Sequence, residues 1–233
     1  MNTCHLWWSS VGKKLLNGLS GLMLIGFVCV HLAGNLTLFA RDGGKLFNSY
    51  AHHLEALGPL LYAMEFGLIA IFLLHIASAV SVRLSQKEAR PQAYAVAASK
   101  GGPSKQSLSS RSMLITGLLL AGFVVLHVKM FKYGPYYETT LKDGTVVRDL
   151  YKLVVEEFSK PVITWAYVVI MLMLGLHLRH GFWSALQSLG ALKPKCSGCV
   201  YAAGLLFAIL LAGGFLLLPL YFLYCPAATG GVP

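Results

Sequence analysis

Charged residues are scarce in this chain of 233 residues. Asp, Glu, Lys and Arg together fill only 12% of the positions, and nine of those residues are acidic. Soluble domains usually carry about twice that share of charge. The scarcity excludes a soluble globular domain of ordinary composition. A hydrophobic content of 56% and a mean hydropathy of +0.65 indicate a membrane protein instead.

Motifs of soluble enzymes are also missing. The sequence has no glycine-rich dinucleotide fingerprint after a strand, no phosphate-binding P-loop and no Ser-His-Asp pattern in a soluble context. Of the five cysteines, only Cys196 and Cys199 form a motif, CSGC. It is two ligands short of a zinc or iron–sulfur site and lacks the histidine that covalent haem attachment requires. We interpret this pair as inert thiols, and we expect partner subunits to handle any soluble substrate.

Five apolar stretches predict membrane-spanning helices, because about 20 residues of helix cross a bilayer core. The chain is therefore expected to be an all-α membrane protein, with one integral membrane domain over 1–233. The first run is too long for a signal peptide and has no small-residue cleavage site. The predicted helices cover approximately 17–40, 59–83, 112–131, 161–186 and 199–224.

The distribution of Lys and Arg predicts the orientation. A cytoplasmic N-terminus puts eleven of the 19 Lys and Arg residues on the cytoplasmic side and the remaining eight on the other. The positive-inside rule therefore favours a cytoplasmic N-terminus. Under that orientation the net charge of +10 reflects topology and a basic inner face, and nothing indicates nucleic-acid binding.

A twelve-residue segment occurs twice. Residues 20–31 read SGLMLIGFVCVH, and residues 116–127 read TGLLLAGFVVLH. The match predicts an internal repeat, in which the first and second helices correspond to the third and fourth. Each copy ends in a histidine, and four histidines lie inside predicted spans: His31, His75, His127 and His177. One such residue could be a neutral imidazole bonded to a neighbouring helix, but intramembrane ionisable residues more often mark function.

Depth in the membrane sorts these histidines into two pairs. At a rise of about 1.5 Å per residue, His31 and His127 fall in the outer half, and His75 and His177 fall in the inner half. Each pair can clamp one iron from opposite faces. The two levels are very roughly 12 Å apart, which suits electron transfer between two haems. On sequence alone His180 is an alternative to His177, because it lies one helical turn away.

Other polar residues near the predicted helices have candidate roles. A haem carries two propionates that favour cations near the water interface, although the same residues could be interfacial anchors. Glu65 lies in the outer half of the second helix and is a candidate proton acceptor for a quinol; alternatively, it hydrogen-bonds another helix or a haem edge. The candidate propionate contacts are Arg83, Arg179 and His180 at the inner level, and Lys129 and Lys132 at the outer level.

The connecting segments are short. We expect a short surface helix within 84–110 and a hairpin turn at Asp143-Gly144. The segment RDLYKLVVEEF, residues 148–158, is expected to be helical, with Leu150, Leu153, Val154 and Phe158 on one face. His52, His53 and Glu55 are interpreted as a proton entry or as wet loop residues at the outer mouth of the second helix.

Over about 200 residues the chain resembles one known family. This family is the dihaem cytochrome b membrane-anchor subunits of succinate:quinone oxidoreductases, that is, succinate dehydrogenase or fumarate reductase. The segments that carry the resemblance, in order, are VHLAGN around His31, FNSYAHH at 47–53, YAMEF around Glu65, LLHI around His75, SRSMLITG before the third helix, LHV around His127 and LGLHLRHGFWSALQSLG around His177.

The resemblance implies two haem b groups. His75 and His177 would bind the proximal haem, with His177 favoured over His180, while His31 and His127 would bind the distal one. It also implies flavoprotein and iron–sulfur partner subunits on the cytoplasmic face of a bacterial inner membrane. Electrons would pass between succinate or fumarate and a membrane quinone, with menaquinone favoured.

Two other interpretations remain open at this point. The chain could be the dihaem cytochrome b subunit of another respiratory enzyme, such as a formate dehydrogenase or hydrogenase, or an ascorbate-reducing cytochrome. It could also be a haem-free transporter that uses intramembrane His and Glu as a proton or cation path. The genes next to this one would distinguish another dihaem enzyme from a succinate:quinone oxidoreductase. A haem spectrum would distinguish a cytochrome from a haem-free transporter.

Overall fold

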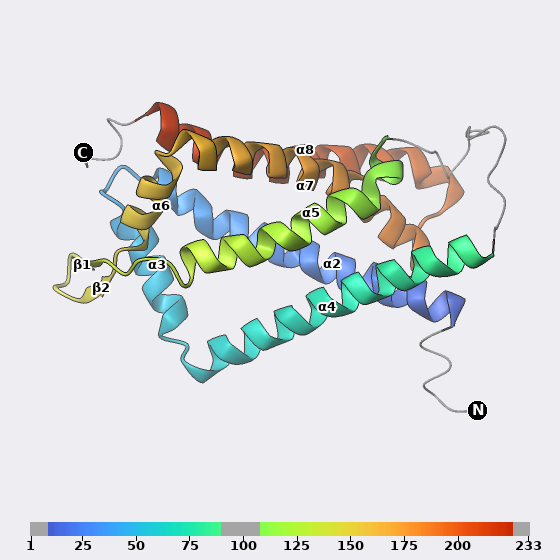
Figure 1. Cartoon of the computed structure of the whole chain (residues 1–233), viewed down its shortest axis with the longest axis horizontal. Helices are drawn as coiled ribbons and strands as arrows, with labels where there is room; N and C mark the ends of the chain where they lie inside the picture. The colour runs from blue at the N-terminus through green and yellow to red at the C-terminus, as the bar shows by residue number, and fades with distance from the viewer. Residues whose placement is uncertain (1–8, 90–107, 226–233) are drawn as a thin grey trace. The chain divides into compact units, whose positions relative to one another are not determined.

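Long α-helices dominate the computed structural model, which describes residues 9–89 and 108–225. Each of five long helices contains a stretch that is long and apolar enough to cross a membrane. The prediction of five spanning helices is therefore confirmed in number, length and apolarity. The helices are α2 (Ser10–Asn35), α4 (Pro59–Glu88), α5 (Leu108–Phe131), α7 (Pro161–Ser188) and α8 (Ser197–Tyr224) (Figure 1).

Several helices extend beyond the apolar runs that predicted them. The first was expected over 17–40, but α2 begins at Ser10, and a short 3-10 helix, Leu36–Phe39, follows it. Lys13 and Lys14 continue the helix because lysine is a good helix former. An apolar run therefore marks the part of a helix that suits the bilayer, and the helix itself is longer.

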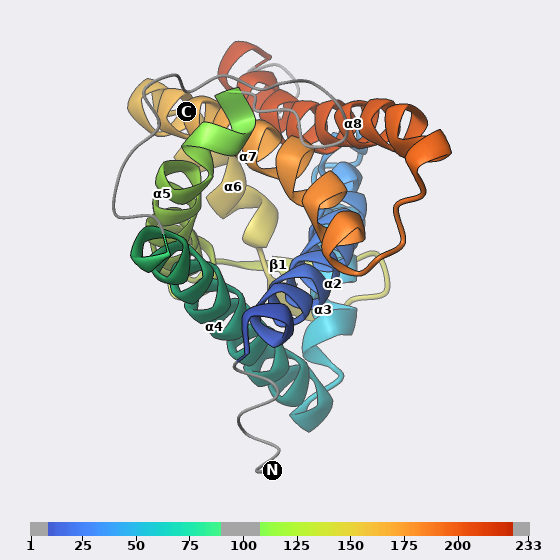
Figure 2. The same cartoon turned by 90° about the vertical axis from the view of Figure 1, so that its right-hand side faces the viewer.

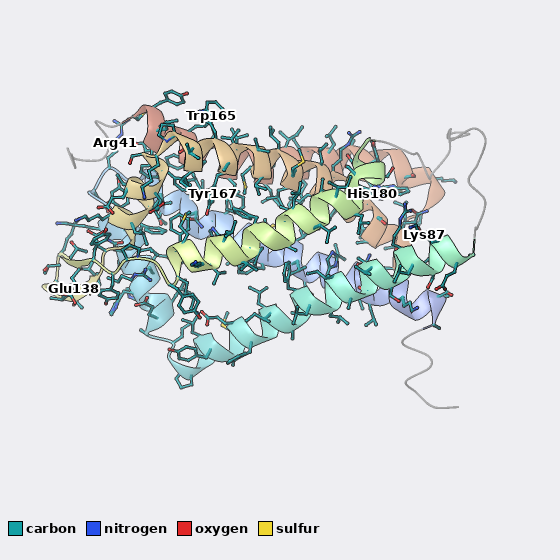
Figure 3. All side chains as sticks on the ribbon, viewed as in Figure 1. Arg41, Lys87, Glu138, Trp165, Tyr167 and His180 are labelled. Carbon is teal, nitrogen blue, oxygen red and sulfur yellow. The ribbon has the colours of Figure 1, made fainter. Side chains whose placement is uncertain are left out.

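Large apolar side chains cover the outside of these helices. Phe66 is 71% exposed and Val162 is 81% exposed. Figure 3 shows carbon-rich side chains projecting all along the long helices, whereas oxygen and nitrogen atoms concentrate around the connecting segments near Glu138. A bilayer would accept these apolar surfaces, because lipid tails are as apolar as the side chains themselves.

The chain divides into two compact units, and each contains parts of several helices. Among the described residues the first unit contains 9–27, 66–89, 108–117 and 176–208, and the second contains 28–65, 118–175 and 209–225. In the first unit, α2 and α4 lie side by side (Figure 2). The Ser78 hydroxyl donates to Oδ1 of Asn17 at 3.3 Å, and Nζ of Lys13 donates to Oγ of Ser85 at 3.4 Å.

In the second unit a β-hairpin connects α5 to the short helix α6 (Leu150–Phe158). Strands β1 (Glu138–Thr140) and β2 (Val146–Arg148) pair antiparallel, with Thr139 opposite Val147. The predicted turn at Asp143-Gly144 is confirmed: Gly144 has a φ of 86°, and the Thr145 N–H donates to Oδ1 of Asp143 at 3.0 Å. Hydrogen bonds from the Thr145 backbone and side chain lower the pKa of Asp143.

Helix α6 forms within the segment where a helix was expected, but it begins two residues later, at Leu150, and the face it buries is rotated. Leu153, Val154 and Phe158 are buried as predicted, whereas Leu150 is only half-buried, and Tyr151 and Val155 are buried in addition. The reason lies at the N-terminus of the helix, where Asp149 accepts from the Lys152 N–H at 3.0 Å and Asn48 accepts from the Tyr151 N–H at 2.9 Å. These bonds hold Tyr151 against α3 (Lys45–Glu55), the helix that contains Asn48.

Helix α3 (Lys45–Glu55) was not predicted. The interpretation of His52, His53 and Glu55 as loop residues is wrong, because all three lie in the last turn of this helix. Gly44, directly before the helix, has a φ of 81°, and the Tyr151 ring occupies the space that a Cβ at Gly44 would need. Only glycine fits there.

The short surface helix expected within 84–110 falls mainly on residues 90–107, which lie outside the described part of the chain. At its edges α4 continues to Glu88, and α5 begins at Leu108.

Replacing Asn48 with alanine is expected to destabilise the second unit by about 2 kcal/mol. Asn48 is 1% exposed; its Nδ2 donates to Oδ1 of Asp149 at 2.8 Å, and its Oδ1 accepts from the Tyr151 N–H. The substitution removes both hydrogen bonds: the Tyr151 N–H loses its bond to Oδ1 of Asn48, and Oδ1 of Asp149 keeps only the bond from the Lys152 N–H. Thermal unfolding of detergent-purified protein measures the loss, with Ser49→Ala as the neighbouring control. Equal melting temperatures for the two variants would contradict the prediction.

Candidate functional site

His75 and His177 face each other within the first unit. His75 comes from α4 and His177 from α7, and their ring centroids are 6.5 Å apart with an interplanar angle of 73°. Both side chains are half-buried. The structure thus brings together the two histidines that the depth argument paired at the inner level.

Two other helices support this pair. Nδ1 of His75 lies 3.2 Å from Oγ of Ser20 on α2, and Nδ1 of His177 lies 3.1 Å from Oγ1 of Thr116 on α5. The next residue in each helix is glycine. A Cβ at Gly21 would lie 3.3 Å from Cε1 of His75, and a Cβ at Gly117 would lie 3.3 Å from Cε1 of His177. The two supporting helices therefore leave space for the rings and bind their Nδ1 atoms.

His31 and His127 form the second pair, within the second unit. Their ring centroids are 5.8 Å apart, and the rings are nearly perpendicular at 88°. Aromatic side chains surround the pair. The centroid of Phe215 on α8 lies 5.7 Å from that of His31, and those of Phe123 and Phe131 lie 5.4 and 5.3 Å from that of His127. The outer-level pairing from the sequence thus also corresponds to a juxtaposition in the structure.

The two rings of this second pair have different hydrogen-bonding partners. Nδ1 of His127 lies 3.2 Å from the hydroxyl of Tyr167 on α7, which is labelled in Figure 3. That hydroxyl donates to the sulfur of Met130 at 3.7 Å, so its oxygen is available to accept from Nδ1–H. The His31 ring instead has Nδ2 of Asn35 3.5 Å from its Nε2, at the limit of a hydrogen bond.

His180 does not occupy the place opposite His75. Its ring centroid lies 6.2 Å from that of Trp183, one turn further along α7. The ring that faces His75 is that of His177, so the geometry favours His177 as the partner of His75.

The candidate cations have different environments. Arg179 donates from NH2 to the Tyr201 hydroxyl at 2.6 Å. Among the described residues, buried Nε of Arg179 and buried Nε1 of Trp183 have no hydrogen-bond partner. They are one helical turn apart on α7, as a pair that binds an anionic group would be. Trp183 was not predicted as a site residue, although it lies in the segment that carries the family resemblance. Arg83 and Lys129 are exposed.

Glu65 forms an ion pair with Lys132, just past the end of α5. Both residues belong to the second unit, and both side chains are partly exposed, at 32% for Glu65 and 40% for Lys132. Lys132 was considered as a propionate contact, but in the structure its ammonium is directed to the carboxylate instead. The only acid within a predicted span therefore has a cationic partner from the turn that follows α5.

The donor atoms limit what each pair can bind. Within 9–89 and 108–225, no three His, Cys, Asp or Glu side chains come together to hold a metal ion. Cys196 and Cys199 are exposed free thiols at the start of α8. Each histidine pair offers two imidazoles, which is the axial ligand set of an iron whose other four ligands belong to a macrocycle.

Comparison of the chain with known proteins finds no matching family model, no matching curated protein and no matching solved structure.

Proposed function

We propose that this chain is a dihaem cytochrome b of the membrane. It carries electrons between soluble flavoprotein and iron–sulfur partner subunits and a quinone in the bilayer, as the anchor subunit of a succinate:quinone oxidoreductase does. The observation that carries the proposal is the presence of two facing histidine pairs, each drawn from two different apolar helices.

The spacing of the rings suits one iron between each pair. Two imidazoles that bind an iron from opposite faces have ring centroids roughly 6 Å apart, because each metal–nitrogen bond is about 2 Å long. The observed separations are 5.8 and 6.5 Å. His75 and His177 would hold the proximal haem, and His31 and His127 the distal one.

Buried N–H groups support the same proposal at the first pair. Arg179 and Trp183 each present a buried nitrogen that lacks a partner in the described part of the chain. An unsatisfied buried donor costs free energy, so native proteins supply it with an acceptor. Carboxylate groups of a haem bound by His75 and His177 would be suitable acceptors.

Haem, when bound, supplies a one-electron carrier that cycles between ferrous and ferric iron. The two histidine pairs would hold the haems, and the aromatic side chains around His31 and His127 would keep water away and tune the potential of the group bound there. Electron transfer from one haem to the other would require the short separation that the sequence predicts, roughly 12 Å at the rise of a helix.

Glu65 has the chemistry for the quinone end. Oxidation of one quinol to quinone releases two electrons and two protons, and the protons need a titratable acceptor beside the quinol. Glu65 lies in the same unit as His31 and His127. We propose that its carboxylate takes a quinol proton and that Lys132 positions that carboxylate.

Purified full-length protein is expected to contain two haem b per chain in a pyridine haemochrome assay. An anaerobically added naphthoquinol should reduce both haems. Protein that lacks a Soret band after haem supplementation would overturn the proposal and favour a haem-free transporter. In native membranes succinate should reduce these haems, whereas reduction by formate or hydrogen alone would assign the chain to another dihaem enzyme.

A further inference from the structure

We propose that Ser20 and Thr116 are a matched pair of positioning residues for His75 and His177. Their hydroxyl oxygens accept hydrogen bonds from Nδ1–H of the two rings, which fixes the tautomer that leaves both Nε2 atoms free to bind iron. This inference rests on the proposed function, because the role of the two histidines as iron ligands comes from there.

The Ser20 hydroxyl has one proton, which it donates in a hydrogen bond to the backbone. Oγ of Ser20 lies 2.6 Å from the carbonyl oxygen of Leu16, one turn earlier in α2. A serine inside a helix commonly donates to this carbonyl. Because a hydroxyl has a single proton, Oγ can only accept from Nδ1 of His75, which lies 3.2 Å away. Nδ1 of His75 therefore carries the ring proton.

Thr116 has the same arrangement on α5. Its Oγ1 lies 3.0 Å from the carbonyl oxygen of Ser112 and 3.1 Å from Nδ1 of His177. The hydroxyl donates to the carbonyl and accepts from the ring. In a neutral imidazole with the proton on Nδ1, Nε2 carries a lone pair, and it is this lone pair that binds a metal. Both rings thus have the same tautomer.

The sequence repeat explains why the arrangement occurs twice. Ser20-Gly21 and Thr116-Gly117 are the first two residues of the two twelve-residue segments, and His31 and His127 are the last. Each segment therefore gives a hydroxyl and a glycine to one histidine pair and a ligand to the other. A serine or threonine in a helix often donates to its own backbone without any further role. That habit does not explain why both hydroxyl oxygens also lie beside Nδ1 of a histidine.

The hydrogen bond has a measurable consequence for the metal. An Nδ1–H that donates to an oxygen makes the imidazole a more basic ligand and fixes the ring orientation. A more basic ligand stabilises ferric iron over ferrous iron. Loss of one hydroxyl should therefore weaken retention of the proximal haem and raise its midpoint potential, while the distal haem is unaffected.

Thr116→Val is the main test, because valine keeps the branched shape and removes the hydroxyl. The proximal haem, identified as the one that His75→Ala lacks, should dissociate about tenfold faster to an apomyoglobin acceptor. If it is retained, its reduction equilibrium should shift up to about tenfold toward the ferrous form, which is about 59 mV for one electron. Ser20→Ala should affect the same haem. Spectroelectrochemical titration of the full-length protein follows both haems separately.

Two further variants separate positioning from general structure. Thr116→Ser keeps the hydroxyl and should restore the wild-type potential. Ser78→Ala removes a hydroxyl that is 0% exposed and bonds the His75 carbonyl oxygen at 3.0 Å, but not the His75 ring. This control should leave both potentials unchanged.

The outcomes distinguish this inference from the proposed function. Wild-type protein without haem would overturn both. Two haems in the wild type, with unchanged potentials and retention in Thr116→Val and Ser20→Ala, would overturn only the positioning role. A shift confined to the distal haem would also overturn it. If Thr116→Val does not accumulate, Ser20→Ala alone decides.

Discussion

Replacing His75 or His177 with alanine is expected to lower the haem content from two per chain to one, with the same haem lost in both variants. Each haem iron needs both axial imidazoles for tight, low-spin binding. The ring centroids of His75 and His177 are 6.5 Å apart, so each ring is the partner of the other. Removing either ring should therefore remove the same haem. Pyridine haemochrome assays give the haem count, and reduced-minus-oxidised spectra identify the haem that remains.

Replacing His31 or His127 should remove the other haem. The spectra of His75→Ala and His177→Ala should therefore match each other, and so should those of His31→Ala and His127→Ala. The spectra of the first two variants should differ from those of the second two. His180→Ala is the matched control on α7 and should keep both haems. Identical residual spectra for His75→Ala and His31→Ala would contradict the pairing, and loss of haem in His180→Ala but not in His177→Ala would move the ligand by one helical turn.

Glu65→Gln is expected to slow quinol oxidation at least about 100-fold, because glutamine keeps the shape of glutamate but cannot accept a proton. Both haems should remain, since Glu65 is paired with Lys132 and glutamine keeps the size of its side chain. The measurement is the rate at which a naphthoquinol reduces the haems, together with the haem content of the same preparation. Glu55→Gln, an exposed acid at the end of α3, is the matched control and should keep the wild-type rate.

Lys132→Met distinguishes a proton acceptor from a structural ion pair. If Glu65 takes the proton and Lys132 only orients the carboxylate, the lysine variant should lose less than about tenfold in rate. Equal losses in Glu65→Gln and Lys132→Met would instead mean that the ion pair matters only for structure. A wild-type rate in Glu65→Gln would assign proton uptake to another group.

The sequence predicted the spanning helices and the histidine pairs for the same physical reason. A bilayer requires long apolar runs, and within such a run the residue count gives depth at a fixed rise per residue. Counting residues therefore placed His31 with His127 and His75 with His177 before any contact was known. It could not decide between His177 and His180, because one turn of helix is smaller than the uncertainty in where a span begins.

The features that the sequence did not predict depend on contacts between helices. Helix α3 has too few apolar residues to stand out by hydropathy, and its buried Asn48 is hydrogen-bonded to Asp149 and Tyr151, about a hundred residues later in the chain. The Glu65–Lys132 ion pair likewise joins α4 to the turn after α5, and the hydroxyl partners of His75 and His177 come from separate helices. For the hydroxyls a signal was present, because both repeated segments begin with a hydroxyl residue followed by glycine.

Helix α8 has a consequence for the biogenesis of the protein. It lies outside the repeated helices, yet its Phe215 packs beside the His31 ring, and a Cβ at Gly214 would lie 2.8 Å from Leu32 of α2. Helix α2 is therefore covered at His31 by a helix that is synthesised later than α4, α5 and α7. Until α8 inserts, the nascent chain presents one side of that ring to lipid or to the insertion machinery. The environment of the His31–His127 pair is complete only after α8 has joined the earlier helices.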